Sequence, residues 1–292
     1  MRVTERTRVG MMTLAQTRAS ARLDTAARIA SNGQRVSKPS DDPAAYGSMI
    51  RKSYAIALLD QHSQIATRAE GELDVAEHAL SQGLDLLSRA REAAIAGANT
   101  TADAHARRLL GDEVRTLREQ LIGIANTRYE NKYVFAGTRT DVEPFDPVTA
   151  AFSGNDQIVR VPVLEGVAPP GNVSGARAFT AAGGRDIFAE LDGLAQALYA
   201  DDVTGITSRI DALKEGHEQI VRSQVEAGFG AERFRSAVDI IASTRTAIAE
   251  QLNHEIEGDP MSQLTELTLA RTAYERSVAV TKQLLQIGTG ST

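Results

Sequence analysis

The stretch that decides the fold runs from Met261 to Ile287 and reads MSQLTELTLARTAYERSVAVTKQLLQI. Apolar residues recur in it at spacings of three and four, which only a helix gathers on one face. This near-heptad repeat contains Leu264, Leu267, Tyr274, Val278 and Leu285, with Arg271 and Thr281 as polar interruptions. Such a one-sided helix is typical of coiled coils and must pack against a partner.

The other end of the chain offers that partner. Residues 1–32 predict a second amphipathic helix, and Gly33 follows where a helix C-cap is expected. Its apolar residues are mostly small and recur about every four positions: Met11, Ala15, Ala19, Leu23, Ala27 and Ala30. We therefore predict that the two terminal helices pair, with both chain ends at the same end of the pair.

Composition favours long helices over a compact enzyme. The 292 residues are 42% apolar but only 4% aromatic, with no Trp. The net charge of −6 gives no general attraction to nucleic acid, so no nucleic-acid partner is expected. The absence of Cys excludes disulfides. The N-terminus lacks the apolar core of a signal peptide, which makes a cytoplasmic protein the plain interpretation and leaves open export without a cleaved signal.

A loop and a helix start are predicted at residues 31–45, SNGQRVSKPSDDPAA. Pro39 restricts Lys38 to an extended conformation. Ser40 or Asp41 is expected to cap the next helix, with Pro43 in its first turn. Asp41 and Asp42 then lie at the positive end of the helix dipole. Capping accounts for both carboxylates, so no metal site is predicted.

The middle of the chain predicts two antiparallel helices, at about 44–97 and 104–127, joined by the turn NTTAD at 99–103. Gly71 and Gly83 interrupt the first helix. The periodicity changes at Tyr129, and Tyr133 to Phe135 predicts a strand. Residues 138–185 are rich in turn residues and predict a small β-rich insert, with strands around Ile158 to Val163. We expect this insert to tolerate change better than the chain ends.

Helices resume at Ile187, with breaks expected at Asp201-Asp202, Gly228-Phe229-Gly230 and Gly258-Asp259-Pro260. The predicted fold class is therefore mainly α, a long antiparallel helical coiled-coil rod with paired N- and C-terminal helices and a small β-rich insert. Three domains are expected: an inner domain of residues 1–42 and 258–292, a rod of 43–137 and 186–257, and an outer domain of 138–185.

The sequence offers no recognisable catalytic chemistry. The histidines are scattered and none pairs at metal-ligand spacing: His62, His78, His105, His217 and His254. There is no phosphate-binding loop, and Gly228-Phe229-Gly230 lacks the preceding strand of a nucleotide site. No serine has the context of a nucleophile. We predict no enzyme activity, no cofactor and no small-molecule substrate.

Several stretches resemble the bacterial flagellin family. Residues 31–45 are similar to its N-terminal loop. Three further stretches resemble the hook-associated branch of this family. They are LREQLIGIANTRYENKYVFAGTRTDVEPF (117–145), GRDIFAEL (184–191) and LTELTLARTAYERSVAVTKQLL (264–285). The tail IGTGST departs from the Leu-rich ending typical of filament flagellins.

This resemblance implies an inner coiled coil of terminal helices, a helical rod and an outer β domain. It also implies a structural protein that forms a ring between a hook-associated protein and the flagellin filament, outside the cell. Export by the flagellar type III pathway and a chaperone on the C-terminal helix are implied as well. The subunit interface would then use Met11, Ala15, Ala19, Leu23, Ala27, Leu264, Leu267, Tyr274, Val278 and Leu285. Alternatives are a filament flagellin or a cytoplasmic coiled-coil adaptor.

Overall fold

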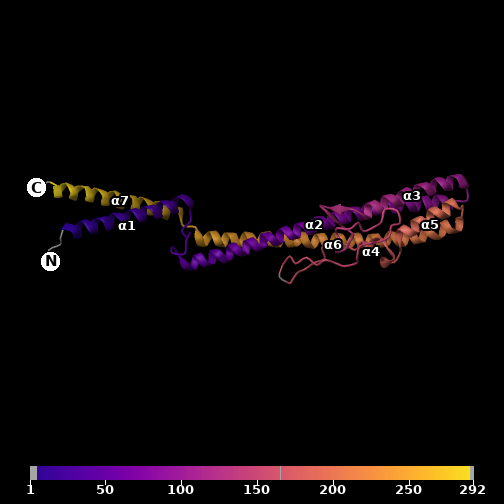
Figure 1. Ribbon diagram of the computed structural model, residues 1–292, viewed down its shortest axis with the longest axis horizontal. Coiled ribbons are helices and arrows are strands. Elements are labelled where there is room, and N and C mark those ends of the chain that lie inside the picture. Colours follow the sequence, from indigo (N-terminus) through magenta and orange to yellow (C-terminus); the bar gives the residue numbers. More distant parts are fainter. Residues whose placement is uncertain (1–4, 165, 290–292) are drawn as a thin grey trace. The chain divides into compact units, whose positions relative to one another are not determined.

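The computed structural model describes residues 5–164 and 166–289, apart from the side chains of 5, 6, 8, 9 and 284–289. The chain is mainly helical, which confirms the predicted fold class (Figure 1). The long helices are α1 (Glu5–Asn32), α2 (Pro43–Ala98), α3 (Ala104–Ala125), α5 (Ile187–Tyr199), α6 (Val203–Ile256) and α7 (Pro260–Thr289). The short elements are α4 (Gly175–Phe179), the 3-10 turn η1 (Ala181–Gly183), β1 (Arg128–Tyr129) and β2 (Lys132–Tyr133).

The structure divides into two compact units. Residues up to Leu58 and from Thr244 onward form one unit, and Leu59–Ser243 form the other. We call them the terminal unit and the central unit. Helices α2 and α6 contribute residues to both. The three-domain division expected from the sequence remains a prediction.

The central unit is built around a continuous apolar core to which α2, α3, α5 and α6 all contribute. Its largest fully buried side chains include Leu80, Leu87, Leu121, Leu191 and Phe234. The predicted 99–103 turn is present, and the Asp103 side chain caps α3 by accepting a hydrogen bond of 2.7 Å from the Ala106 N–H. Short turns of this kind keep consecutive helices adjacent in a bundle.

Close helix packing explains why one expected break is absent. The prediction of a break at Gly228-Phe229-Gly230 was wrong, because α6 runs unbroken through these residues. A Cβ at Gly230 would lie 2.8 Å from Leu73 Cδ1, so the glycine makes room for a buried leucine of α2. Tertiary packing here outweighs the low helix propensity of glycine.

The insert differs from its prediction. Within its described residues, pairing is limited to isolated bridges between Phe145 and Phe152, Arg160 and Pro170, and Leu164 and Val167. The strand predicted at Tyr133 to Phe135 is reduced to β2, which pairs with β1 in a two-stranded antiparallel sheet. Prolines lack the N–H that a strand ladder requires, so the bridge at Pro170 is made by bonds on either side of it, from the Val161 N–H to the Pro169 carbonyl at 3.0 Å and from the Gly171 N–H to the Val159 carbonyl at 2.8 Å.

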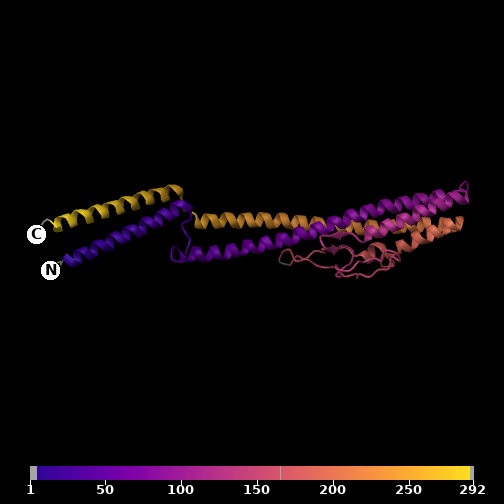
Figure 2. The same cartoon turned by 45° about the horizontal axis from the view of Figure 1, so that its top comes forward.

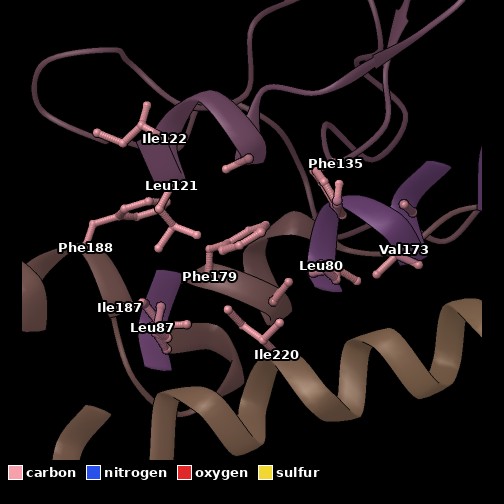
Figure 3. Close-up of a cluster of buried hydrophobic side chains, with 14 of the residues drawn as sticks. Leu80, Leu87, Leu121, Ile122, Phe135, Val173, Phe179, Ile187, Phe188 and Ile220 are labelled. Atoms are coloured by element: carbon pink, nitrogen blue, oxygen red, sulfur yellow. The ribbon is translucent and has the colours of Figure 1, made fainter. Parts of the chain in front are cut away.

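Aromatic side chains join the insert to the helices. Phe179 lies 5.3 Å from Phe135, 5.7 Å from Phe145 and 5.9 Å from Phe188, measured between ring centroids. Figure 3 shows Phe179 and Phe188 among Leu80, Leu87, Leu121 and Ile220. The insert therefore supplies part of the core, and its tolerance of change remains a prediction.

One buried amide fixes the end of the insert against α6. The Gln219 side chain is buried and its Nε2 donates to the carbonyl oxygens of Thr180 and Arg185, both at 3.1 Å. Its Oε1 accepts from the Arg185 N–H at 2.8 Å. A buried amide with these partners is satisfied, so its hydrogen bonds offset the cost of desolvation while they orient the chain.

Candidate subunit interface

Helices α1 and α7 of the terminal unit lie side by side and antiparallel, as Figures 1 and 2 both show. The start of α1 and the end of α7 lie at the same end of this pair, as the sequence predicted. Arg22 and Glu266 form an exposed ion pair of 2.7 Å between the two helices. Tyr274 of α7 lines the same shallow hollow as Gln16 and Ser20 of α1.

The pair buries very little. Among the described side chains of α1 and α7, only Ala26 and Ala270 are fully buried, at 5% and 1% exposure. The predicted interface residues that are half-buried are Ala19, Leu23, Leu267, Tyr274 and Val278. Large apolar side chains therefore contribute only part of their surface within one chain.

Other predicted interface residues are exposed. Met11 is 62% exposed and Leu264 is 55% exposed, and Ala15 and Ala27 also face solvent. A strict four-residue spacing advances about 40° around a helix at each step, so the run from Met11 to Ala27 cannot remain on one face. The half-buried face of α1 instead follows a three–four alternation through Met12, Gln16, Ala19, Leu23, Ala26 and Ala30. The side chain of Leu285 lies outside the described residues.

Exposed apolar residues are numerous on both helices. Leu14 of α1 and Met261, Leu269 and Val280 of α7 are about half exposed or more. Apolar surface of this kind usually marks a site of association. The arrangement therefore offers helix faces for protein contacts.

The loop that follows α1 and the loop that precedes α7 are hydrogen-bonded to each other. Gly33 ends α1 with a φ of 73°, and its N–H donates to the Ile29 carbonyl at 2.8 Å. Its own carbonyl accepts from the Gly258 N–H at 3.2 Å and from Gln263 Nε2 at 3.0 Å. The Arg35 N–H donates to the Ile256 carbonyl at 2.7 Å. We call these connected loops, residues 33–42 and 257–259, the joint.

Helix α2 begins at Pro43 with Asp42 as its N-cap, so of the predicted capping residues Ser40, Asp41 and Asp42 only Asp42 takes this position. Asp42 Oδ1 accepts from the N–H groups of Ala44 and Ala45, at 3.1 and 3.0 Å. The Ala45 N–H, followed by the Arg35 side chain, holds the pKa of Asp42 below its usual value. The correction has a local cause, because Pro43 occupies the first helical position and the residue before it becomes the cap.

Asp41 stabilises the loop instead. Its Oδ2 accepts from the Ser37 N–H at 3.1 Å and from the Lys38 N–H at 3.2 Å. The Ser37 N–H makes the largest contribution to lowering the pKa of Asp41, and the charge of Arg28 adds to it. Arg28 also bonds to the Ser37 hydroxyl, so the end of α1 is fixed to the loop.

An ion pair connects α2 and α6 next to the joint. Lys52 Nζ lies 2.6 Å from Glu255 Oε1. The Lys52 hydrogen bond, followed by that of Ser48, lowers the pKa of Glu255. Arg35 adds a bond of 3.2 Å to the Glu255 carbonyl. None of these pairings between distant residues has a periodic signal in the sequence, and sequence reasoning missed the joint.

Neither a metal site nor a membrane-spanning helix is found in the part of the chain that the structure describes. No three His, Cys, Asp or Glu side chains gather there in a way that suits a metal ion. None of the described helices combines the length and apolarity needed to cross a bilayer.

Comparison with known proteins supports a flagellar relationship. Residues 9–140 match the family described as the bacterial flagellin N-terminal helical region. The chain is 33% identical over 130 residues to flagellar hook-associated protein 3 of Salmonella typhimurium, covering 44% of this chain. The same-named protein of Escherichia coli is 32% identical over 131 residues. In both cases the match spans 41% of the relative's length. The resemblance to the flagellin family is confirmed.

Solved structures share the fold. A putative flagellar hook-associated protein from Vibrio parahaemolyticus superposes with a TM-score of 0.69 at 17% identity, over 74% of this chain and 100% of that one. FlgL from Xanthomonas campestris gives 0.63 at 15% identity, over 69% and 99% of the two chains. The flagellar junction protein FlgL from Legionella pneumophila gives 0.59 at 14% identity, over 72% and 99%.

Proposed function

We propose that this chain is a structural subunit of the bacterial flagellum that joins the hook-associated ring to the flagellin filament. The observation that carries the proposal is the α1–α7 pair, which fully buries only two alanines among its described side chains and leaves apolar residues exposed on both helices. The names of the matched relatives, hook-associated protein 3 and flagellar junction protein, support this assignment over filament flagellin.

Assembly would bury what the single chain leaves exposed. Fully burying a leucine, valine or methionine stabilises by about 1.5–3 kcal/mol. Met11 and Leu264 have most of this surface still to bury. Neighbouring copies that pack α1 and α7 into a larger coiled coil supply the missing contacts. We therefore retain all ten predicted residues as the proposed interface.

The remaining features follow from this role. The partners are other copies of this chain in a ring, an adjacent hook-associated protein and flagellin, without enzyme activity. Location outside the cell requires export, which we assign to the flagellar type III pathway without a cleaved signal peptide. The exposed apolar face of α7 needs cover before assembly, and a dedicated export chaperone would provide it.

Immunogold labelling of an epitope-tagged chain, on sheared flagella and on sectioned cells, tests the proposal. We expect label only at the boundary between hook and filament. Label along the whole filament would identify a flagellin. Label confined to the cell interior would identify a cytoplasmic coiled-coil adaptor and reject flagellar assembly altogether.

A further inference from the structure

Two contrasting exposed helix faces lie next to the joint within the terminal unit. On α2, Ile50, Tyr54 and Leu58 are all exposed, and Tyr54 is 71% exposed. We call them the large-residue face. On α6, Thr244, Ala247 and Gln251 are also exposed, and we call them the small-residue face. Each set falls within about 80° around its helix, so each forms one stripe.

The two faces lie differently around the contact between α2 and α6, and the large-residue face points away from it. Tyr54 is two residues from Lys52, which is about 200° around the helix, and Lys52 pairs with Glu255 of α6. On α6, Ala247 is eight residues from Glu255, which is about 80° around the helix, and it is exposed all the same. Both faces are therefore uncovered within the chain.

We propose that the large-residue face of one copy packs on the small-residue face of the next copy in the ring. This inference rests on the proposed function, since a ring requires a heterologous contact between two different surfaces of each subunit. Bulky side chains fit where two of the opposing residues, Thr244 and Ala247, are small. Neither face contains a charge, as is typical of the centre of a protein interface.

The flanking charges fit the same contact. Arg51 borders the large-residue face and Glu250 borders the small-residue face, and both are exposed. Opposite charges at the rim of two faces favour their association and fix its register. Two copies related by two-fold symmetry would instead place like charges together, which disfavours pairing of a face with itself.

The positions of the two faces along the helix axes allow them to meet between neighbouring copies in a ring. The Lys52–Glu255 ion pair sets residue 52 opposite residue 255. In an antiparallel pair, Tyr54 is then nearly level with residue 253 and lies about 8 Å along the axis from the middle of the small-residue face. A neighbour displaced by this small stagger brings the two faces together.

The contact is too small to hold two copies by itself. One tyrosine and two aliphatic side chains cover roughly 400 Å², about half of the area that each partner contributes to a stable pair. The faces therefore meet only when the α1–α7 helices also assemble. A purified dilute chain stays monomeric.

Cross-linking tests the contact cleanly because the natural chain has no cysteine. The variant Tyr54→Cys/Ala247→Cys replaces the native chain in cells, and sheared flagella are treated with a short bismaleimide. We expect a ladder of covalent oligomers of this chain. Each single variant should remain monomeric. The control Ile95→Cys/Ala247→Cys, which places its first cysteine at an exposed residue near the end of α2, should give no ladder.

Three results would overturn the proposal: no ladder from the double variant, a Tyr54→Cys dimer linked to itself, or a product with a different protein. Immunogold labelling of the same preparation scores the proposed function separately. Label along the filament together with a ladder would reject the junction role and retain the contact. If the chain is absent from flagella, concentrated purified protein is cross-linked, and lack of a ladder there also overturns the contact.

Discussion

The central and terminal units use apolar residues in opposite ways. The central unit encloses five buried phenylalanines in one core with leucines from α2, α3, α5 and α6. The α1–α7 pair of the terminal unit buries alanines and leaves Met11, Leu264 and Leu269 exposed. The central unit has a core of its own, whereas the α1–α7 pair leaves apolar surface that the proposed assembly would cover. This difference predicts that stability and assembly depend on separate regions of the chain.

Leu267→Asp gives the largest expected effect and tests this separation directly. Leu267 is half-buried on α7, and a charge there opposes packing of the terminal helices. We expect incorporation into flagella to be abolished while the melting of the central unit is unchanged. Circular dichroism and immunoblots of sheared flagella measure the two quantities. Leu109→Asp, on an exposed residue of α3, is the control that should incorporate normally.

Phe179→Ala should act on the other unit. Phe179 is fully buried among three aromatic rings, and truncation of such a side chain costs about 3–5 kcal/mol. Chemical denaturation should report this loss in the free energy of unfolding. Phe229→Ala removes an aromatic ring that is 67% exposed and should change stability by about 0.5 kcal/mol at most. Equal losses from both variants would contradict the assigned core.

Gly230→Val tests the close approach of α2 and α6. The added side chain would collide with Leu73, which is buried in the core and must shift to make room. Overpacking of this kind costs about 1–3 kcal/mol. Gly123→Val is the matched control, since a Cβ at Gly123 meets nothing within 4 Å. A thermal melt that falls equally for both variants would mean that only helix propensity is being measured.

Local signals in the sequence predicted the helices but not their tertiary context. The sequence correctly predicted the helix of α7, Gly33 at the end of α1 and a chain break at Gly258-Asp259-Pro260, although Pro260 is already the first residue of α7. The prediction of a helix break at Gly228 to Gly230 was wrong, because Gly230 makes room for Leu73, which lies on a helix distant in the sequence. The bonds that join Gly33 to Gly258 connect loops over 200 residues apart, and no periodicity encodes them.

Asp42→Ala should have a smaller, local effect on the terminal unit. Loss of the cap frees the N–H groups of Ala44 and Ala45, so we expect their amide exchange to accelerate roughly fivefold. Ser40→Ala serves as the control and should leave both amides unchanged. Protection lost in the Ser40 variant, and not in the Asp42 variant, would return the cap to the position expected from the sequence.

Glu72→Gln is expected to change stability least of these variants. It contrasts the carboxyl pKa values of the two units. Burial raises the pKa of Glu72 in the central unit, and the nearby charge of Lys132 only partly opposes this. By contrast, the hydrogen bonds of the joint lower the pKa values of Asp41 and Asp42.

A carboxyl group with a raised folded pKa binds its proton more tightly in the folded state. It therefore destabilises the fold once ionised, and this penalty disappears as the pH falls through the folded pKa and then the unfolded value. Glu72→Gln removes the ionisable group, so its melting temperature at pH 7 should exceed that of the natural chain by about 1–2 °C. The gap should close as the pH approaches 4.

The aspartates of the joint change the stability of the fold with pH in the opposite direction. They stabilise the fold above their unfolded pKa, and this contribution is lost as the pH falls through their lowered folded values. Melting curves from pH 4 to pH 7 check the Glu72 variant, with Glu119→Gln on an exposed residue of α3 as the control. A Glu72→Gln variant that melts lower than the natural chain at pH 7, by a margin that Glu119→Gln does not share, would mean that the ionised carboxylate has a stabilising partner in the folded chain.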